Sequence, residues 1–165
     1  MESREEIVIF LSEFDYQVGV IERLYNTIER KKKLLDQEGI IPELVESAGY
    51  WLHNLYCAFE DLFKLITGYW ENHMQINGEY HIQLLRRMHL SIEGIRPALL
   101  SDKSFRELNE LRGFRHAFRH AYNYGLDDER VRHLLHRILN AKEIIKEDIQ
   151  AFRNRVNDNS PESEF

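Results

Sequence analysis

Apolar residues recur at intervals of three and four along most of the chain, and this spacing restricts the fold more than any other feature. A helix that buries one stripe of its surface requires such spacing, whereas a half-buried strand requires strict alternation, which the sequence lacks. One such series opens the chain, with Ile7, Phe10, Leu11, Phe14, Val18, Ile21, Leu24, Tyr25 and Ile28. The spacing predicts an all-α fold.

Cap and turn residues divide the pattern into about five helices. Ser3 and Glu6 have the spacing of a capping box before the first helix. Pro42 suits the start of the second, and a shorter third helix is predicted over residues 80–91. A second capping box at Ser104 predicts the start of the fourth. The last long helix is predicted from Val131, Leu134, Leu135, Ile138, Leu139, Ala141, Ile144, Ile145, Ile149 and Phe152. The sequence therefore predicts a helical bundle.

Length and composition favour one domain over residues 1–155, followed by a flexible polar tail over residues 156–165. The single cysteine excludes an intrachain disulfide and a cysteine-based zinc site. No apolar run approaches the roughly 18 residues of a membrane span, and the N-terminus lacks the pattern of a signal peptide. We therefore expect a cytoplasmic protein without membrane contact.

The segment 112–123 holds the densest group of basic, titratable and aromatic side chains, with no acidic residue among them. On a helical wheel, one side of this segment holds Phe114, Ala117, Phe118 and Ala121. The opposite arc, about 160° wide, holds Arg112, Arg115, His116, Arg119, His120, Tyr122 and Asn123. The helix is expected to be anchored through its phenylalanines and to present its basic side chains outward.

The charge of the chain bears on what this segment binds. The formal net charge of −6 argues against non-specific binding of nucleic acid. From Lys103 to Arg137, however, eight lysines or arginines accompany five acidic residues. Because a local group of cations concentrates a polyanion even on an acidic protein, a local phosphate site remains consistent with the composition.

The side chains of the segment suit cleavage of RNA without a metal or other cofactor. That reaction needs a base for the 2′-hydroxyl, cations beside the pentavalent phosphorane and an acid for the leaving oxygen. Histidine exchanges protons near neutral pH, and the arginine fork holds phosphate oxygens. We predict that Arg115 and His120 are catalytic and that Arg112 and Arg119 bind phosphate.

Each of these residues also has an ordinary structural interpretation that involves no catalysis or binding. Arg115 alone suits a surface ion pair, and His120 alone suits a polar helix face. His116 lies four residues before His120, but two histidines without a third ligand are a weak metal signal. Three more residues, which are candidates for accessory contacts with RNA or a partner, also suit an ordinary exposed surface: His81, Arg86 and Arg87.

Positions five apart on an ideal helix differ by about 140°, so Arg115 and His120 do not lie side by side. Two arrangements solve this difficulty. Either the helix is irregular near these residues, or the site is assembled from two chains.

Arg115, His120 and Tyr122 together read R-x4-H-x-Y, with the polar His116 directly after the arginine. This pattern resembles the signature of HEPN-superfamily ribonucleases, and specifically of the HepT toxins. Two further stretches are also similar to the HepT-like group, residues 51–63 and 80–88. The resemblance covers residues 3 to about 150.

The resemblance implies a HEPN-like two-fold homodimer whose motifs face each other across a cleft, with one chain's arginine opposite the other's histidine. It implies an endoribonuclease toxin that cleaves tRNA or mRNA. It also implies an antitoxin, a minimal nucleotidyltransferase that adds AMP to Tyr122, so that bulk and negative charge block RNA. Tyr122 is also a candidate for binding RNA or phosphate through its phenol, and so is His116. Tyr124 is nearby but is expected to face the core.

The alternative function is a non-catalytic helical module. In that case the basic face is a docking surface for a nucleotidyltransferase or a nucleotide. Growth arrest upon expression of the chain alone separates the two, because only a toxin produces it.

Overall fold

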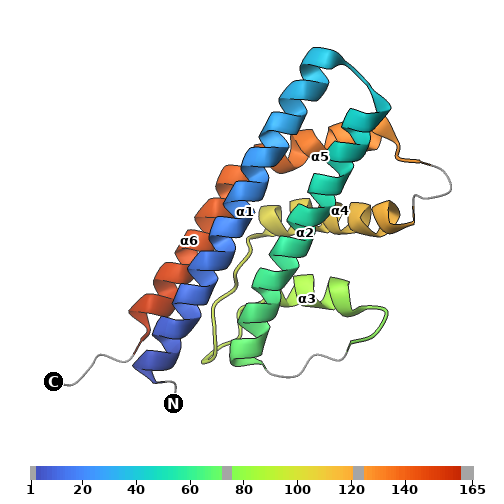
Figure 1. Ribbon diagram of the computed structural model, residues 1–165. Coiled ribbons are helices and arrows are strands. Elements are labelled where there is room, and N and C mark those ends of the chain that lie inside the picture. The colour runs from blue at the N-terminus through green and yellow to red at the C-terminus, as the bar shows by residue number, and fades with distance from the viewer. Residues whose placement is uncertain (1–2, 72–75, 121–124, 161–165) are drawn as a thin grey trace.

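A computed structural model describes residues 3–71, 76–120 and 125–160. Within these ranges the chain forms six helices and no strand, which confirms the predicted all-α bundle (Figure 1). The helices are α1 (Arg4–Glu38), α2 (Pro42–Trp70), α3 (Tyr80–His89), α4 (Asp102–Arg119), α5 (Asp128–Asn140) and α6 (Lys142–Asp158). Over the same ranges, none of the helices combines the length and the apolar character needed to cross a membrane.

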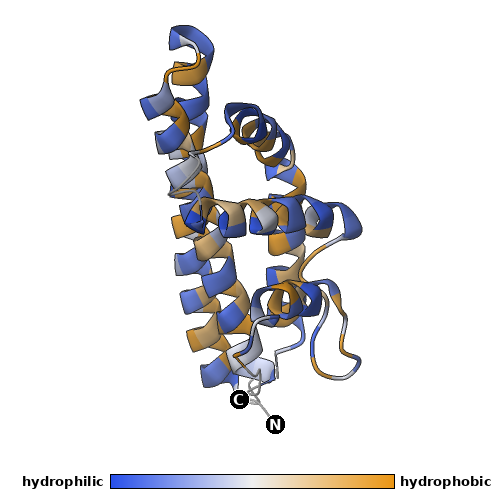
Figure 2. Cartoon of the chain, turned by 90° about the vertical axis from the view of Figure 1, so that its right-hand side faces the viewer, coloured by the Kyte–Doolittle hydropathy of each residue, from blue (hydrophilic) through white to orange (hydrophobic). Residues whose placement is uncertain are grey.

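The two long helices α1 and α2 run antiparallel, and α6 lies alongside α1 (Figure 1). Helix α4 crosses α2 at a steep angle and also contacts α3, α5 and α6. Each helix carries both hydrophobic and hydrophilic residues, as expected for a helix that buries one side (Figure 2). The crossing of α2 by α4 brings the segment predicted to be functional against the middle of the bundle.

Aromatic side chains form much of the core between α1, α2 and α6. Phe14 stacks on Phe152 with ring centroids 5.7 Å apart, and Phe10 meets the edge of Trp70 at 4.8 Å. The largest fully buried side chains include Tyr56, Phe10, Phe14, Phe59, Phe63, Phe114 and Phe152. Aromatic rings bury a large apolar area each, so this core holds the long helices as one unit.

The first predicted capping box is confirmed, and the second is wrong by one turn. Ser3 Oγ accepts from the Glu6 N–H, and the Ser3 N–H donates to the Glu6 carboxylate at 2.9 Å. Helix α4 is capped by Ser101 rather than by Ser104, which is buried. Asp148 of α6 accepts hydrogen bonds from the N–H and the hydroxyl of Ser101 at 2.8 and 2.7 Å. A tertiary partner therefore fixes this helix start.

The predicted last long helix is wrong, because it is divided into α5 and α6 at Ala141. The N–H of this buried residue donates to the carbonyls of Arg137 and Leu139, which closes one helix before the next begins. No glycine or proline marks the break, so the apolar periodicity passes through it. At the other end, α6 continues to Asp158 and buries Val156, so the helix extends past the expected start of the tail.

Candidate active site

Helix α4 ends inside the R-x4-H-x-Y motif. Arg119 is its last residue, and His120 is the cap, with φ −109° and ψ 12°. The His120 N–H donates to the carbonyls of both Ala117 and Phe118, so the helix tightens at its end. The helix is therefore irregular at His120, but no hydrogen bond, ion pair or ring contact joins Arg115 to His120 among the described residues. Tyr122 lies outside the described residues, as do Ala121, Asn123 and Tyr124.

The outward side chains of this last turn are His116, Arg119 and His120, as predicted. The rings of the two histidines lie 4.7 Å apart. None of the three side chains forms an ion pair or hydrogen bond with another residue in the described ranges. They therefore present cationic and titratable groups to solvent. Arg112 is half-buried, and its Nε donates to Asn109 Oδ1 at 3.0 Å.

Arg115 does not face outward, which corrects the helical-wheel prediction. Its side chain is only 14% exposed, and its Nε lies 3.6 Å from Glu60 Oε1. The segment 112–123 itself contains no acidic residue, but the fold brings one from α2 to Arg115. The Glu60 side chain is 3% exposed, and burial of a carboxylate is costly without a cationic partner.

A third helix, α3, provides a second hydrogen-bonding partner for the Glu60 carboxylate. His81 of α3 lies with its Nδ1 2.6 Å from the other oxygen, Oε2, of Glu60. The imidazole is 35% exposed, so one edge reaches the carboxylate and the ring remains open to solvent. Glu60 of α2 thus contacts side chains of both α3 and α4. His81 therefore belongs to the candidate site, whereas the sequence analysis also allowed it to be ordinary exposed surface.

His53 and Tyr56 complete the α2 side of the site. The His53 ring stacks on Phe118 at 5.0 Å. Burial lowers the pKa of His53, and the positive charges of Arg115 and Arg119 lower it further. Burial also raises the pKa of the Tyr56 hydroxyl. Both groups are therefore neutral near pH 7, beside the arginines.

The sequence analysis missed the polar residues of α2, because all the candidate residues it named lie after this helix. His53, Tyr56 and Glu60 follow one another at intervals of three and four, so they share one face of the helix. Polar residues at helical spacing within an apolar stripe were the available signal. That face packs against the C-terminal half of α4.

A comparison with known protein families shows to which family the chain belongs. A family model described as HepT-like protein matches residues 47–156. The chain belongs to the HepT-like family of the HEPN superfamily. The match contains Glu60, His81, Arg115 and His120, and it confirms the resemblance drawn from the motif. Neither a curated protein nor a solved structure matches the chain.

In this HepT-like chain, a close approach of α2 to Leu126 and to the last turns of α4 depends on Gly49. A Cβ at this position would lie 2.6 Å from Leu126 Cδ1, and 3.5 and 3.6 Å from the rings of Phe114 and Phe118. The first distance is shorter than real Cβ contacts, so Leu126 must shift if a side chain is added. Gly49 therefore sets how closely the chain on both sides of the motif packs on α2.

Two glycines of the same helix give a matched test of this packing. Gly68→Ala is expected to stabilise the HepT-like chain by about 0.5–1 kcal/mol, since alanine favours helix and nothing lies within 4 Å of its Cβ. Gly49→Ala is expected to lack this gain because it displaces Leu126. Urea unfolding followed by circular dichroism measures both, and equal gains would contradict the close packing.

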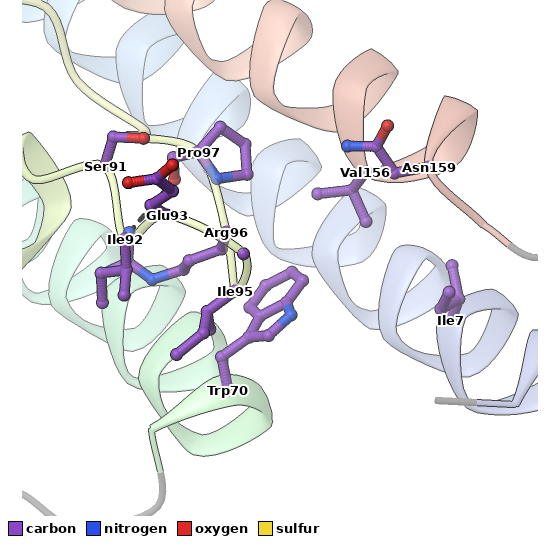
Figure 3. Close-up of a pocket in the computed structure, with 11 residues that line it drawn as sticks. Ile7, Trp70, Ser91, Ile92, Glu93, Ile95, Arg96, Pro97, Val156 and Asn159 are labelled. Carbon is purple, nitrogen blue, oxygen red and sulfur yellow. Dashed lines mark hydrogen bonds between the residues drawn. The ribbon is translucent and has the colours of Figure 1, made fainter. Parts of the chain in front are cut away.

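The HepT-like chain also has a pocket away from this site (Figure 3). It measures about 510 Å³ and lies between the end of α2, the loop over residues 91–97, the start of α1 and the end of α6. Trp70 and Ile95 line it with Pro97 and Val156, and none of the described residues of the motif does. Across the described ranges, no group of three or more histidine, cysteine or acidic side chains is placed to hold a metal ion.

Proposed function

We propose that the chain is a metal-independent endoribonuclease and the toxin of a toxin–antitoxin pair, with Arg115 and His120 as its catalytic residues. One observation carries this proposal. A buried carboxylate holds Arg115 beside a turn whose basic side chains, His116, Arg119 and His120, have no ion-pair partner among the described residues. Unpaired guanidinium and imidazole groups beside a fixed arginine suit a phosphodiester.

Each side chain has a role in the proposed cleavage of tRNA or mRNA. Arg115 binds the phosphate whose charge grows as the 2′-oxygen attacks, and Arg112 and Arg119 bind the same or a neighbouring phosphate. His120 transfers a proton, since an imidazole ring can both accept and donate one. His116 accompanies it at the exposed surface and contacts RNA.

The different surroundings of Arg115 and His120 support a site built from two chains. Arg115 is paired with Glu60 of α2, whereas His120 is exposed at the end of α4. A two-fold contact brings the same patch of each chain together. In the proposed homodimer, the His120 of one chain faces the arginine of the other.

His120→Ala is expected to abolish RNA cleavage and growth inhibition, with a rate loss of about 10²–10⁴ for a missing acid or base. The exposed side chain makes no contact with another described helix, so thermal unfolding is expected to be unchanged. His133→Ala, on the exposed face of α5, is the matched control. An alanine variant at 120 that cleaves RNA like the wild type would contradict the assignment.

Tyr122 is the proposed site of regulation. Its position in the motif makes it the tyrosine to which a minimal nucleotidyltransferase antitoxin adds AMP, and the added charge repels RNA. Mass spectrometry of the chain co-expressed with such a partner is expected to show AMP on the peptide that carries Tyr122. The Tyr122→Phe variant is expected to stay unmodified. Modification that persists in that variant would place it elsewhere.

A further inference from the structure

We propose that His81 is a second catalytic histidine of this site, the base that takes the proton of the attacking 2′-hydroxyl, and that Glu60 is its positioning residue. The proposal rests on the proposed ribonuclease function and adds to it a residue outside the R-x4-H-x-Y motif. It starts from the juxtaposition of three helices at one buried carboxylate.

The contact with Glu60 determines which nitrogen of His81 is available. A carboxylate accepts hydrogen bonds, so the Nδ1 of His81 carries the hydrogen that points to Oε2 at 2.6 Å. The Nε2 of the neutral ring then carries the lone pair. It forms no hydrogen bond with a described residue, and the ring is 35% exposed. The imidazole is therefore held at one edge and open at the edge that accepts a proton.

The same carboxylate places this base beside the phosphate-binding arginine. Glu60 holds His81 through Oε2 and Arg115 through Oε1, at 2.6 and 3.6 Å. The two side chains thus come together from α3 and α4 within one chain. No described contact joins Arg115 to His120. His53 also lies near Arg115, but it is His81 that shares the carboxylate of Glu60 with the arginine.

Burial of the Glu60 carboxylate restricts the orientation of the His81 ring. The Glu60 side chain is 3% exposed and comes from the middle of α2, where the neighbouring Phe59 is fully buried. A carboxylate on such a rigid element has little freedom to turn, so it fixes the planes of the groups bound to it. An imidazole oriented by a carboxylate through one nitrogen and reactive through the other is an effective proton acceptor.

The proton and electron balance of the proposed step is complete. The 2′-hydroxyl proton passes to His81 Nε2 while the 2′-oxygen bonds to phosphorus. The bond between phosphorus and the 5′-oxygen breaks, and protonated His120 donates its proton to the departing oxygen. The products are a 2′,3′-cyclic phosphate and a 5′-hydroxyl, and exchange with water restores both histidines. Arg115 stabilises the charged phosphorane between these steps.

Substitutions at position 81 separate catalysis from a structural role. In His81→Asn the amide N–H still reaches Glu60, but the second ring nitrogen is lost. We expect this variant to melt at the wild-type temperature and bind a tRNA transcript within twofold of the wild type. Its single-turnover cleavage is expected to be at least about 100-fold slower. Imidazole added to His81→Ala is expected to restore part of the rate, because the vacated position is open to solvent. His133→Ala serves as the control for removing an exposed histidine.

Each outcome decides the proposal. Cleavage by His81→Asn at the wild-type rate would show that only the contact with Glu60 matters and would overturn it. Loss of tRNA binding, or a His81→Ala variant that imidazole does not restore, would assign a structural role and also overturn it. Should the asparagine variant fail to fold, the imidazole response of His81→Ala decides alone. Wild-type protein that leaves all tRNA and mRNA intact overturns the ribonuclease function itself, which distinguishes that failure from a failure at His81 alone.

Discussion

Glu60→Ala is expected to lower the free energy of unfolding by about 3–5 kcal/mol, the usual cost of removing one partner of a buried ion pair. The substitution leaves Arg115, 14% exposed, without its carboxylate, and it releases His81. RNA cleavage is expected to be lost even at temperatures where the variant is folded, because neither side chain keeps its orientation. Urea unfolding and single-turnover cleavage measure the two effects.

The next residue along the helix supplies the control. Asp61 is 63% exposed and lies 3.7 Å from Lys64, one turn further along α2. Because exposed pairs contribute only about 0–1 kcal/mol, Asp61→Ala is expected to leave stability and cleavage nearly unchanged. If Glu60→Ala unfolds like Asp61→Ala, the buried carboxylate does not organise the site.

Arg96→Ala is expected to have a similarly large effect on stability, about 3–5 kcal/mol. The Arg96 side chain is fully buried, and its Nη2 donates to Glu71 Oε1 at 2.7 Å and to the Arg87 carbonyl at 2.9 Å. Its Nη1 donates to the carbonyls of Leu90 and Pro97, both at 3.1 Å. Removing the guanidinium takes away the closer cationic partner of the buried Glu71 carboxylate and a side-chain donor to three carbonyls. Guanidinium chloride unfolding measures the loss.

Arg87 offers the comparison for this second prediction. It also approaches Glu71, at 3.5 Å, but its side chain is 39% exposed. Arg87→Ala is expected to cost less than about 1 kcal/mol. Equal losses in the two variants would mean that the loop over residues 91–97 is not held by the buried guanidinium.

The two large effects are expected to differ in activity. Arg96 borders the pocket at the C-terminal end of α2 and donates to the end of α3, but within the described ranges it forms no hydrogen bond or ion pair with Arg115, His120 or His81. At a temperature where both variants are folded, Arg96→Ala is expected to cleave RNA at the wild-type rate, whereas Glu60→Ala is not. This contrast separates a buried ion pair that holds a loop from one that holds reactive groups.

The apolar periodicity predicted the helices well where tertiary contacts agree with it. The Ser3 cap and the Pro42 start both depend on neighbouring residues alone, and both are found as predicted. The start of α4 depends on Asp148, far along the chain, and the break at Ala141 carries no glycine or proline. Ser101 is a local N-cap signal that competes with Ser104, and the tertiary contact with Asp148 accompanies the choice between them. The break at Ala141 has no such local signal.

The site was predictable only in part, for a related reason. The helical wheel placed His116, Arg119 and His120 correctly at the surface, but it was wrong for Arg115. A helical wheel assumes one buried side, but α4 contacts four other helices, so a second side is also covered. That second side holds Arg115, and its partner Glu60 belongs to a helix that the wheel does not include.

The sharing of one carboxylate by Arg115 and His81 has a consequence for how substrate is received. Because the ion pair and the hydrogen bond exist in the free chain, folding itself arranges the two groups before any RNA arrives. Binding then requires little rearrangement of these side chains, and a preorganised environment stabilises developing charge more effectively than one that must reorient. In the proposed enzyme, the ordering of the reactive groups is therefore completed when the bundle forms.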